Sequence, residues 1–148
     1  MTSLFDTAGN ADFVQRIERL PADAKAEWGK MDAAQMFEHC QRAIQVALGE
    51  VQLKRAFIGR IFGGMAKRKY VTGGAPFPQG SPTDPNFIVT DARDFEHEKA
   101  ELVQLVQQLS DPGALTTAPH PFFGPMTPTE WDQLMGKHLD HHLRQFGG

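Results

Sequence analysis

The stretch "TPTEWDQLMGKHLDHHLRQFG", residues 127–147, carries the start signals of a long helix and the densest group of histidines in the chain. Thr127 is a suitable N-cap, and Pro128 suits the first helical position. Glu130 stands three residues after the cap, which completes a capping-box pattern. The sequence therefore predicts a helix over about 127–146, and this helix holds three of the six histidines of the protein.

The spacing of these three histidines predicts different orientations for them. At 100° per residue, His138 and His142 lie about 40° apart, in the middle of an apolar arc. His141 lies on the flank of that arc, where we expect it to form a hydrogen bond or to face solvent. The apolar arc consists of Trp131, Leu134, Met135 and Phe146, and the opposite arc of Gln133, Lys137, Asp140 and Arg144. We expect His138 and His142 to point into the protein, and Asp140 and Arg144 to form an i,i+4 ion pair on the solvated face.

A second helix is predicted over about 32–53, where Asp32 and Gln35 form another capping-box pattern. One stripe of this helix is Met36, His39, Ala43, Val46 and Ala47, and the opposite side holds Glu38, Gln41, Gln45 and Gln52. His39 is therefore expected to face inward. Ala43, one turn further along, is small and would leave space beside the imidazole.

Two further helices and one shorter one complete the predicted fold. Apolar spacing and caps predict helices over about 10–20, beginning at Asn10, and over about 91–109, beginning at Asp91. A shorter helical piece is predicted over about 54–69. The segments 72–86 and 111–125 are rich in glycine and proline, which disfavours regular structure there.

No segment shows a convincing alternating pattern of the kind expected for a strand, and the best candidate, 86–90, is short. These features predict an all-α protein: a four-helix bundle with two long Gly/Pro-rich connections and a short extra helix. The length of 148 residues favours a single domain over 1–148.

Composition narrows the classes of function. Apolar residues make up 41% of the chain and charged residues 22%, and the formal net charge is −3. This charge argues against polyanion binding by the molecule as a whole, so no DNA binding is expected. The sequence has neither an apolar run of the roughly 20 residues that span a bilayer nor a secretory signal, so no membrane partner is expected. The single cysteine, Cys40, rules out an internal disulfide and suits the cytoplasm.

Three inward histidines on two helices suggest a metal centre. Imidazoles one helical turn apart can converge on one ion, and a third ligand from a facing helix leaves at least one coordination position open. Such a site can lower the pKa of a bound water or bind a thiolate. The alternative for each histidine is a hydrogen-bonded core residue. Leu139 stands where a zincin has its general-base glutamate, which argues against a metalloprotease of that type.

The chain resembles the DinB-like superfamily of bacterial four-helix bundles, and within it an uncharacterised branch. The resemblance runs nearly end to end. It rests on "SLFD" at 3–6, "WGKMDAAQMFEHC" at 28–40, "HPFFGPMTPTEW" at 120–131 and "KHLDHHLRQFG" at 137–147.

This resemblance implies a divalent metal ion, with zinc or nickel favoured, held by His39, His138 and His142. Some members of the superfamily look like transferases that use a low-molecular-weight thiol such as bacillithiol, mycothiol or glutathione. Others look like isomerases or hydrolases. A small-molecule substrate is implied, and a homodimer is a candidate assembly.

Other candidate residues have a functional and a structural interpretation. His120 is a candidate fourth ligand or proton shuttle, because histidine titrates near neutral pH, or it fixes its turn by hydrogen bonds. Phe122 and Phe123 are expected to close the core, and Trp28 and Trp131 to pack within it. Cys40 is expected to be a buried structural residue, because its side chain diverges from that of His39. His97 falls on the side of its helix away from the apolar stripe and is expected at the surface.

The segment 54–69 has three interpretations. Residues 51–83 contain no acidic side chain, and the segment alternates lysine and arginine with phenylalanine and isoleucine. A basic amphipathic helix of this kind can bind a membrane surface or a nucleic acid. It can also line a pocket entrance that selects an anionic substrate. The favoured interpretation is a solvated helix that packs its apolar side on the bundle.

The sequence therefore leaves three hypotheses for function. The first is a metal-dependent enzyme, either a thiol-dependent transferase or a hydrolase. The second is a metal-binding or stress-related protein without turnover. The third is an interaction module that works through 54–69.

Overall fold

The computed structural model describes residues 2–148, and this part of the chain is helical, with no β-strand. Five α-helices form: α1 (Thr7–Arg19), α2 (Ala33–Ala47), α3 (Phe57–Ala66), α4 (Phe95–Gln108) and α5 (Pro128–Gln145). A π-helical turn at Lys67–Thr72 and 3-10 turns at Pro85–Phe87 and Pro112–Ala114 lie between them. The prediction of an all-α protein is confirmed.

Side-chain caps set the starts of the helices. The capping boxes predicted for α2 at Asp32 and for α5 at Thr127 are both present. The predicted starts of α1 and α4 are wrong, because Asp6 and Asp94 cap them in place of Asn10 and Asp91. Asn10 is instead buried inside α1, where its amide donates hydrogen bonds to the carbonyl oxygens of Leu4 and Val106.

α2 ends at Ala47, well before the predicted end at 53. Gly49 adopts a positive φ of 74°, a conformation that favours glycine and ends the helix. The amide of Glu50 then donates to the carbonyl of Gln45 at 2.9 Å, as in a C-terminal capping turn. The apolar spacing of residues 48–53 resembles that of a helix, but these residues lie outside α2.

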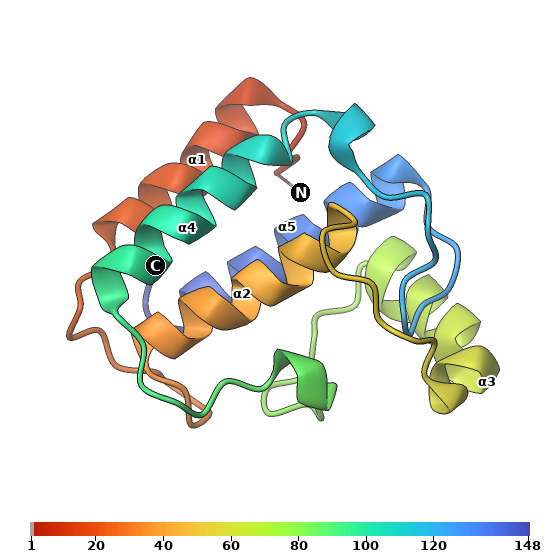
Figure 1. The fold of residues 1–148 in the computed structure, drawn as a ribbon, viewed down its shortest axis with the longest axis horizontal. Helices are drawn as coiled ribbons and strands as arrows, with labels where there is room; N and C mark the ends of the chain where they lie inside the picture. Colours follow the sequence, from red (N-terminus) through yellow and green to blue (C-terminus); the bar gives the residue numbers. More distant parts are fainter. Residues whose placement is uncertain (1) are drawn as a thin grey trace.

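The four longer helices surround one apolar core. α1 lies beside α4 and α2 beside α5, and α2 also contacts α4 as α1 contacts α5 (Figure 1). Each of these helices therefore touches two of the others. The largest buried side chains include Phe13, Ile17, Met36, Phe37, Ile44, Leu102, Trp131, Leu139 and Leu143. This packing fixes the face of α2 that meets the C-terminal half of α5.

Several surface assignments are confirmed, and others are wrong. Asp140 pairs with Arg144 at 2.9 Å as predicted, and also with Arg16 of α1 at 3.0 Å. Lys137, expected on the solvated arc, lies beneath the segment after α3 and donates to the carbonyls of Tyr70 and Ala75. Gln41, also expected in solvent, is buried and donates to the carboxylate of Glu98 at 2.7 Å.

The predictions for the aromatic and cysteine side chains have mixed outcomes. Trp131 and Cys40 are buried as expected, and burial raises the pKa of the Cys40 thiol. Trp28 and Phe122 are only half-buried, because they lie on loops at the edge of the core, whereas Phe123 packs against the core. His97 is exposed, as predicted.

α3 lies at the edge of the molecule, away from α1 and α4 (Figure 1). Its large apolar side chains are exposed, so the expectation that the segment packs its apolar side on the other helices is wrong. Gly59 and Gly63 are the buried residues of this helix and face the backbone of Phe122. None of the helices described for residues 2–148 is both long and apolar enough to cross a membrane.

Candidate metal centre

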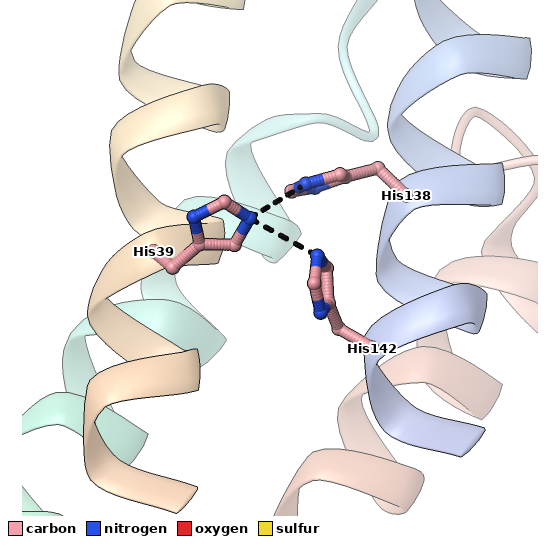
Figure 2. A group of neighbouring side chains, drawn as sticks. All are labelled: His39, His138 and His142. Atoms are coloured by element: carbon pink, nitrogen blue, oxygen red, sulfur yellow. Dashed lines mark hydrogen bonds between the residues drawn. The ribbon is translucent and has the colours of Figure 1, made fainter. Parts of the chain in front are cut away.

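Three histidine side chains meet between α2 and α5. His39 comes from the middle of α2, and His138 and His142 come from successive turns of α5 (Figure 2). Nε2 of His39 lies 3.0 Å from Nε2 of His138 and 3.0 Å from Nε2 of His142. One ring nitrogen from each residue lies within 4.8 Å of the others. The structure thus brings together the three residues that the helical spacing selected, and they could hold a metal ion.

These separations suit ligands of a common ion. Nitrogen ligands sit about 2.0–2.1 Å from zinc, so two of them are about 2.9–3.4 Å apart for ligand–metal–ligand angles between a right angle and the tetrahedral value. The 3.0 Å distances from His39 fall in this interval. The donor set is therefore compatible with a divalent transition-metal ion.

A backbone carbonyl orients His39. Its Nδ1 lies 2.7 Å from the carbonyl oxygen of Phe87, which can only accept a hydrogen bond. Nδ1 therefore carries the proton, and Nε2 presents a lone pair to the other two histidines. A hydrogen-bond acceptor on the far ring nitrogen fixes the tautomer and orientation of a metal-binding histidine.

Gln145 does the same for His142. The amide Nε2 of Gln145 donates to the carbonyl of Trp28 at 2.6 Å, which turns its Oε1 toward Nδ1 of His142 at 2.7 Å. Nδ1 of His142 is therefore the donor, and its Nε2 also presents a lone pair. Two such lone pairs 3.0 Å apart share no proton, and a cation between them would satisfy both.

Burial keeps these imidazoles neutral. It lowers the pKa of His138 well below the ordinary value, with neighbouring His142 and His39 adding to the effect. Burial likewise lowers the pKa of His39, and lowers that of His142 to about 3. Neutral imidazole is the form that binds metals, so near neutral pH these residues need not lose protons before they bind an ion.

His141 stands beside the cluster, outside it. Its ring is half-buried. The centroid of this ring lies 5.0 Å from that of His142, 5.4 Å from that of Trp28 and 6.1 Å from that of Phe77. The flanking position expected from its spacing is therefore what the structure shows. Trp28, Phe77 and His141 together form an aromatic edge next to the three histidines.

His120 is not part of the histidine cluster. Its Nδ1 accepts hydrogen bonds from the backbone amides of Phe122 and Phe123 at 3.0 and 3.1 Å, and its ring packs on Trp131. Burial, aided by the nearby charge of Arg55, lowers its pKa to about 4. This is the turn-fixing arrangement that was the structural alternative for this residue. Only Nε2 remains for any chemical role.

The three candidate ligands are neutral imidazoles and add no negative charge to the site. In the part of the chain that the structure describes, the candidate metal-binding group contains histidines and no carboxylate. A divalent ion held there would keep its positive charge and attract an anionic ligand. Phe87, whose carbonyl orients His39, also lines a pocket of about 250 Å³ together with Glu38 and Arg42, but none of the three histidines lines this pocket.

Sequence reasoning identified the three clustered histidines but missed the groups that orient them. Gln145 lies three residues after His142, a spacing that places the two on one helix face, so this partner could have been found. The carbonyl of Phe87 and that of Trp28 belong to loops, and no sequence signal marks them.

The fold and the cluster define an all-helical protein with a candidate three-histidine metal site. The chain belongs to a family described as proteins of unknown function (DUF1569), whose family model matches residues 2–147. Searches of curated proteins and of solved structures found no match.

Proposed function

We propose that this protein binds a divalent metal ion through His39, His138 and His142. The observation that carries the proposal is the convergence of three Nε2 atoms, two of them with the opposite ring nitrogen held by Phe87 and Gln145. A set of buried core histidines would need no such orientation toward a common point. Zinc and nickel are the favoured ions, since imidazole suits both.

We further propose that the chain is a DinB-like four-helix bundle forming a single domain. The mutual packing of α1, α2, α4 and α5 supports this architecture, as do the long connections between α2 and α4 and between α4 and α5. In such bundles, metal sites are built from side chains on facing helices.

The proposed activity is that of a metal-dependent enzyme acting on a small molecule, either a transferase that uses a low-molecular-weight thiol or a hydrolase. A divalent ion in this site would supply the positive charge that stabilises a thiolate or a deprotonated water. The protein's own residues orient two of the three imidazoles through Phe87 and Gln145, and burial favours the neutral form of all three.

A proton leaving the thiol or water needs an acceptor. His141 is the better placed of two candidates, because it is half-buried and its ring packs on that of His142. His120 retains Nε2 for such a role, whereas two backbone amides occupy its Nδ1.

A non-catalytic metal-binding protein is the second candidate function. The three-histidine cluster is the observation that supports it, and the same cluster is compatible with an enzyme. The two candidates differ in whether the bound ion accepts an exogenous ligand.

Metal analysis of protein purified without a histidine tag tests the binding site. We expect about one ion per chain in the wild-type protein and loss of that ion in His39→Ala. His97→Ala, which removes an exposed histidine on α4, is the matched control and should retain the ion. If the wild-type protein takes up no zinc, nickel or cobalt, or if His39→Ala retains it, the metal site is wrong.

Addition of a thiol to the cobalt-substituted protein separates the two functions. A new sulfur-to-metal charge-transfer band on adding glutathione or a similar thiol would support the enzyme. An unchanged spectrum with thiols, together with no hydrolysis of ester or amide substrates, would favour the non-catalytic protein.

A further inference from the structure

α3 turns a continuous apolar surface toward solvent. Five of its ten residues are large apolar side chains that are at least half exposed: Phe57 at 75%, Ile58 at 62%, Ile61 at 57%, Phe62 at 51% and Met65 at 61%. Exposed apolar side chains are ordinary when scattered, but a contiguous group marks a binding surface. We call these five residues the α3 apolar face.

The exposure follows from how α3 attaches to the protein. A Cβ atom added to Gly59 or Gly63 would lie closer than 3.0 Å to the backbone of Phe122. These two glycines are about 40° apart around the helix, and the α3 apolar face is centred roughly opposite to them. The helix therefore docks through its glycine edge, and the close approach of two backbones holds its large side chains outward.

Exposed basic residues lie within α3 and on both sides of it in the sequence. Lys54, Arg60, Arg68 and Lys69 are exposed, and the sequence from 51 to 83 contains no aspartate or glutamate. Lys67 is less accessible, because it pairs with Glu130 at 3.3 Å and donates to the carbonyl of Pro125. The protein as a whole has a net charge of −3, so this positive charge is local to the α3 region.

We propose that α3 is a peripheral docking site for a membrane surface that contains anionic phospholipid. The α3 apolar face enters the boundary between headgroups and acyl chains, and the surrounding lysines and arginines contact the phosphates. Amphipathic helices with this distribution lie in the plane of the interface, and each basic residue near an anionic leaflet adds to the attraction. The proposal differs from the sequence-based expectation that the protein has no membrane partner, and it is independent of the metal centre.

The positive charge around α3 favours a lipid surface over a second copy of the chain or a nucleic acid as the binding partner. A two-fold contact between copies would place the same basic residues of both chains near each other, which is repulsive. A nucleic acid would meet the phosphates with lysine and arginine but would leave the aliphatic centre of the patch facing a charged backbone. An anionic bilayer satisfies both the apolar centre and the basic surround.

Co-sedimentation of the full chain with lipid vesicles tests the proposal. The vesicles contain phosphatidylcholine alone or phosphatidylcholine mixed with phosphatidylglycerol. We expect binding to the mixed vesicles that weakens as salt is raised, and much weaker binding to phosphatidylcholine alone.

Variants on exposed positions locate the binding surface. Phe57→Ser combined with Ile61→Ser should lower the partition coefficient by about tenfold or more, since burial of one large apolar side chain is worth roughly a tenfold change. Arg68→Glu combined with Lys69→Glu should abolish the preference for anionic lipid. Ile88→Ser, at an exposed isoleucine outside α3, is the matched control and should bind as the wild type does.

Three outcomes would overturn the proposal. The first is that the wild-type chain does not bind the mixed vesicles. The second is that it binds but neither α3 double variant weakens binding. The third is a solution dimer, or a complex with RNA, that is lost in the Phe57→Ser/Ile61→Ser variant while vesicle binding is absent, which would assign the face to that partner. Retained helical circular dichroism in each variant excludes loss of folding as the cause.

Discussion

At the scale of single residues, Gln145 sets the orientation of a proposed ligand without contacting the ion. Its carboxamide is held by the carbonyl of Trp28 and so presents an acceptor to Nδ1 of His142. Gln145→Met removes both hydrogen bonds at similar volume. We expect it to weaken metal affinity by about 10- to 100-fold, as is usual when the partner of a ligating histidine is lost. Competition with a chromophoric chelator measures the dissociation constant.

Gln41→Met is the control for that substitution. Gln41 is also a buried glutamine with two hydrogen bonds, both to Glu98 on α4. Its replacement should destabilise the protein by about 1–3 kcal/mol, because a buried carboxylate loses its donor, and should leave metal affinity unchanged. Equal losses of affinity in both variants would mean that general loosening of the fold, and not the orientation of His142, controls binding.

His120 provides a prediction about pH. Its pKa falls from an ordinary value of 6.5 to about 4 in the folded chain because the ring is buried. Between these values the unfolded chain binds a proton that the folded chain does not, so the free energy of unfolding must fall as pH is lowered from 6.5 to 4. His120→Asn keeps an acceptor for the amides of Phe122 and Phe123 but cannot titrate.

The variant should therefore lose less stability with acid than the wild type, by at most about 3 kcal/mol. Urea unfolding at pH 7 and at pH 4.5, in the presence of a chelator, measures the difference. His138 and His142 titrate in both proteins, so the difference between the proteins reports residue 120, including the effect of its charge on the pKa of His138. Parallel pH profiles would show that His120 is not the source of the dependence.

At the scale of elements, the capping boxes located the starts of α2 and α5 because their donors and acceptors are local in sequence. The end of α2 was missed because the hydrophobic pattern continues past Gly49, whose positive φ overrides it. Lys137 was misplaced for a different reason. Its helical position faces outward, but the segment after α3 folds over it, and no local pattern encodes that cover.

The two neighbouring glycines of α3 offer a sharp test of its docking. Gly63→Ala places a Cβ against the backbone of Phe122, whereas Gly64→Ala places one near only the end of the Arg68 side chain, 3.9 Å away. We expect Gly63→Ala to destabilise the docking of α3 by about 1–3 kcal/mol and Gly64→Ala to be neutral or to stabilise the helix by about 0.5–1 kcal/mol. Amide exchange across residues 57–72 measures the effect locally. Equal protection in both variants would contradict the glycine-mediated contact.

At the scale of the whole molecule, the helical wheel predicted that His39, His138 and His142 face inward, and their expected convergence on one ion assumed that the two helices are neighbours. That convergence depends on which helices become neighbours, and the pairing of α2 with α5 results from packing across the whole core. The prediction that α3 packs its apolar side on the other helices is wrong, because it also depends on tertiary contacts. Hydrophobic periodicity assumes that apolar side chains face the protein, and a glycine contact reverses this.

A metal ion in this centre would connect α2 to α5 and so stabilise the whole fold. An ion that binds only the folded chain stabilises it by about 2.7 kcal/mol at a free concentration of 100 times its dissociation constant. We expect zinc to raise the melting temperature of the wild-type protein and a chelator to lower it. The melting temperature of His142→Ala should not respond to either. A response equal to that of the wild type would place the bound ion elsewhere.

The separation of the ligands along the chain has a consequence for kinetics. His39 is 99 residues from His138 and 103 from His142, so only the two histidines on α5 remain neighbours once the tertiary structure is lost. Full coordination therefore requires a long-range contact, the kind that costs most loop entropy to form. Global unfolding would release the ion. A metal-sensitive dye present in excess would then report each opening of the chain in real time, without any label on the protein.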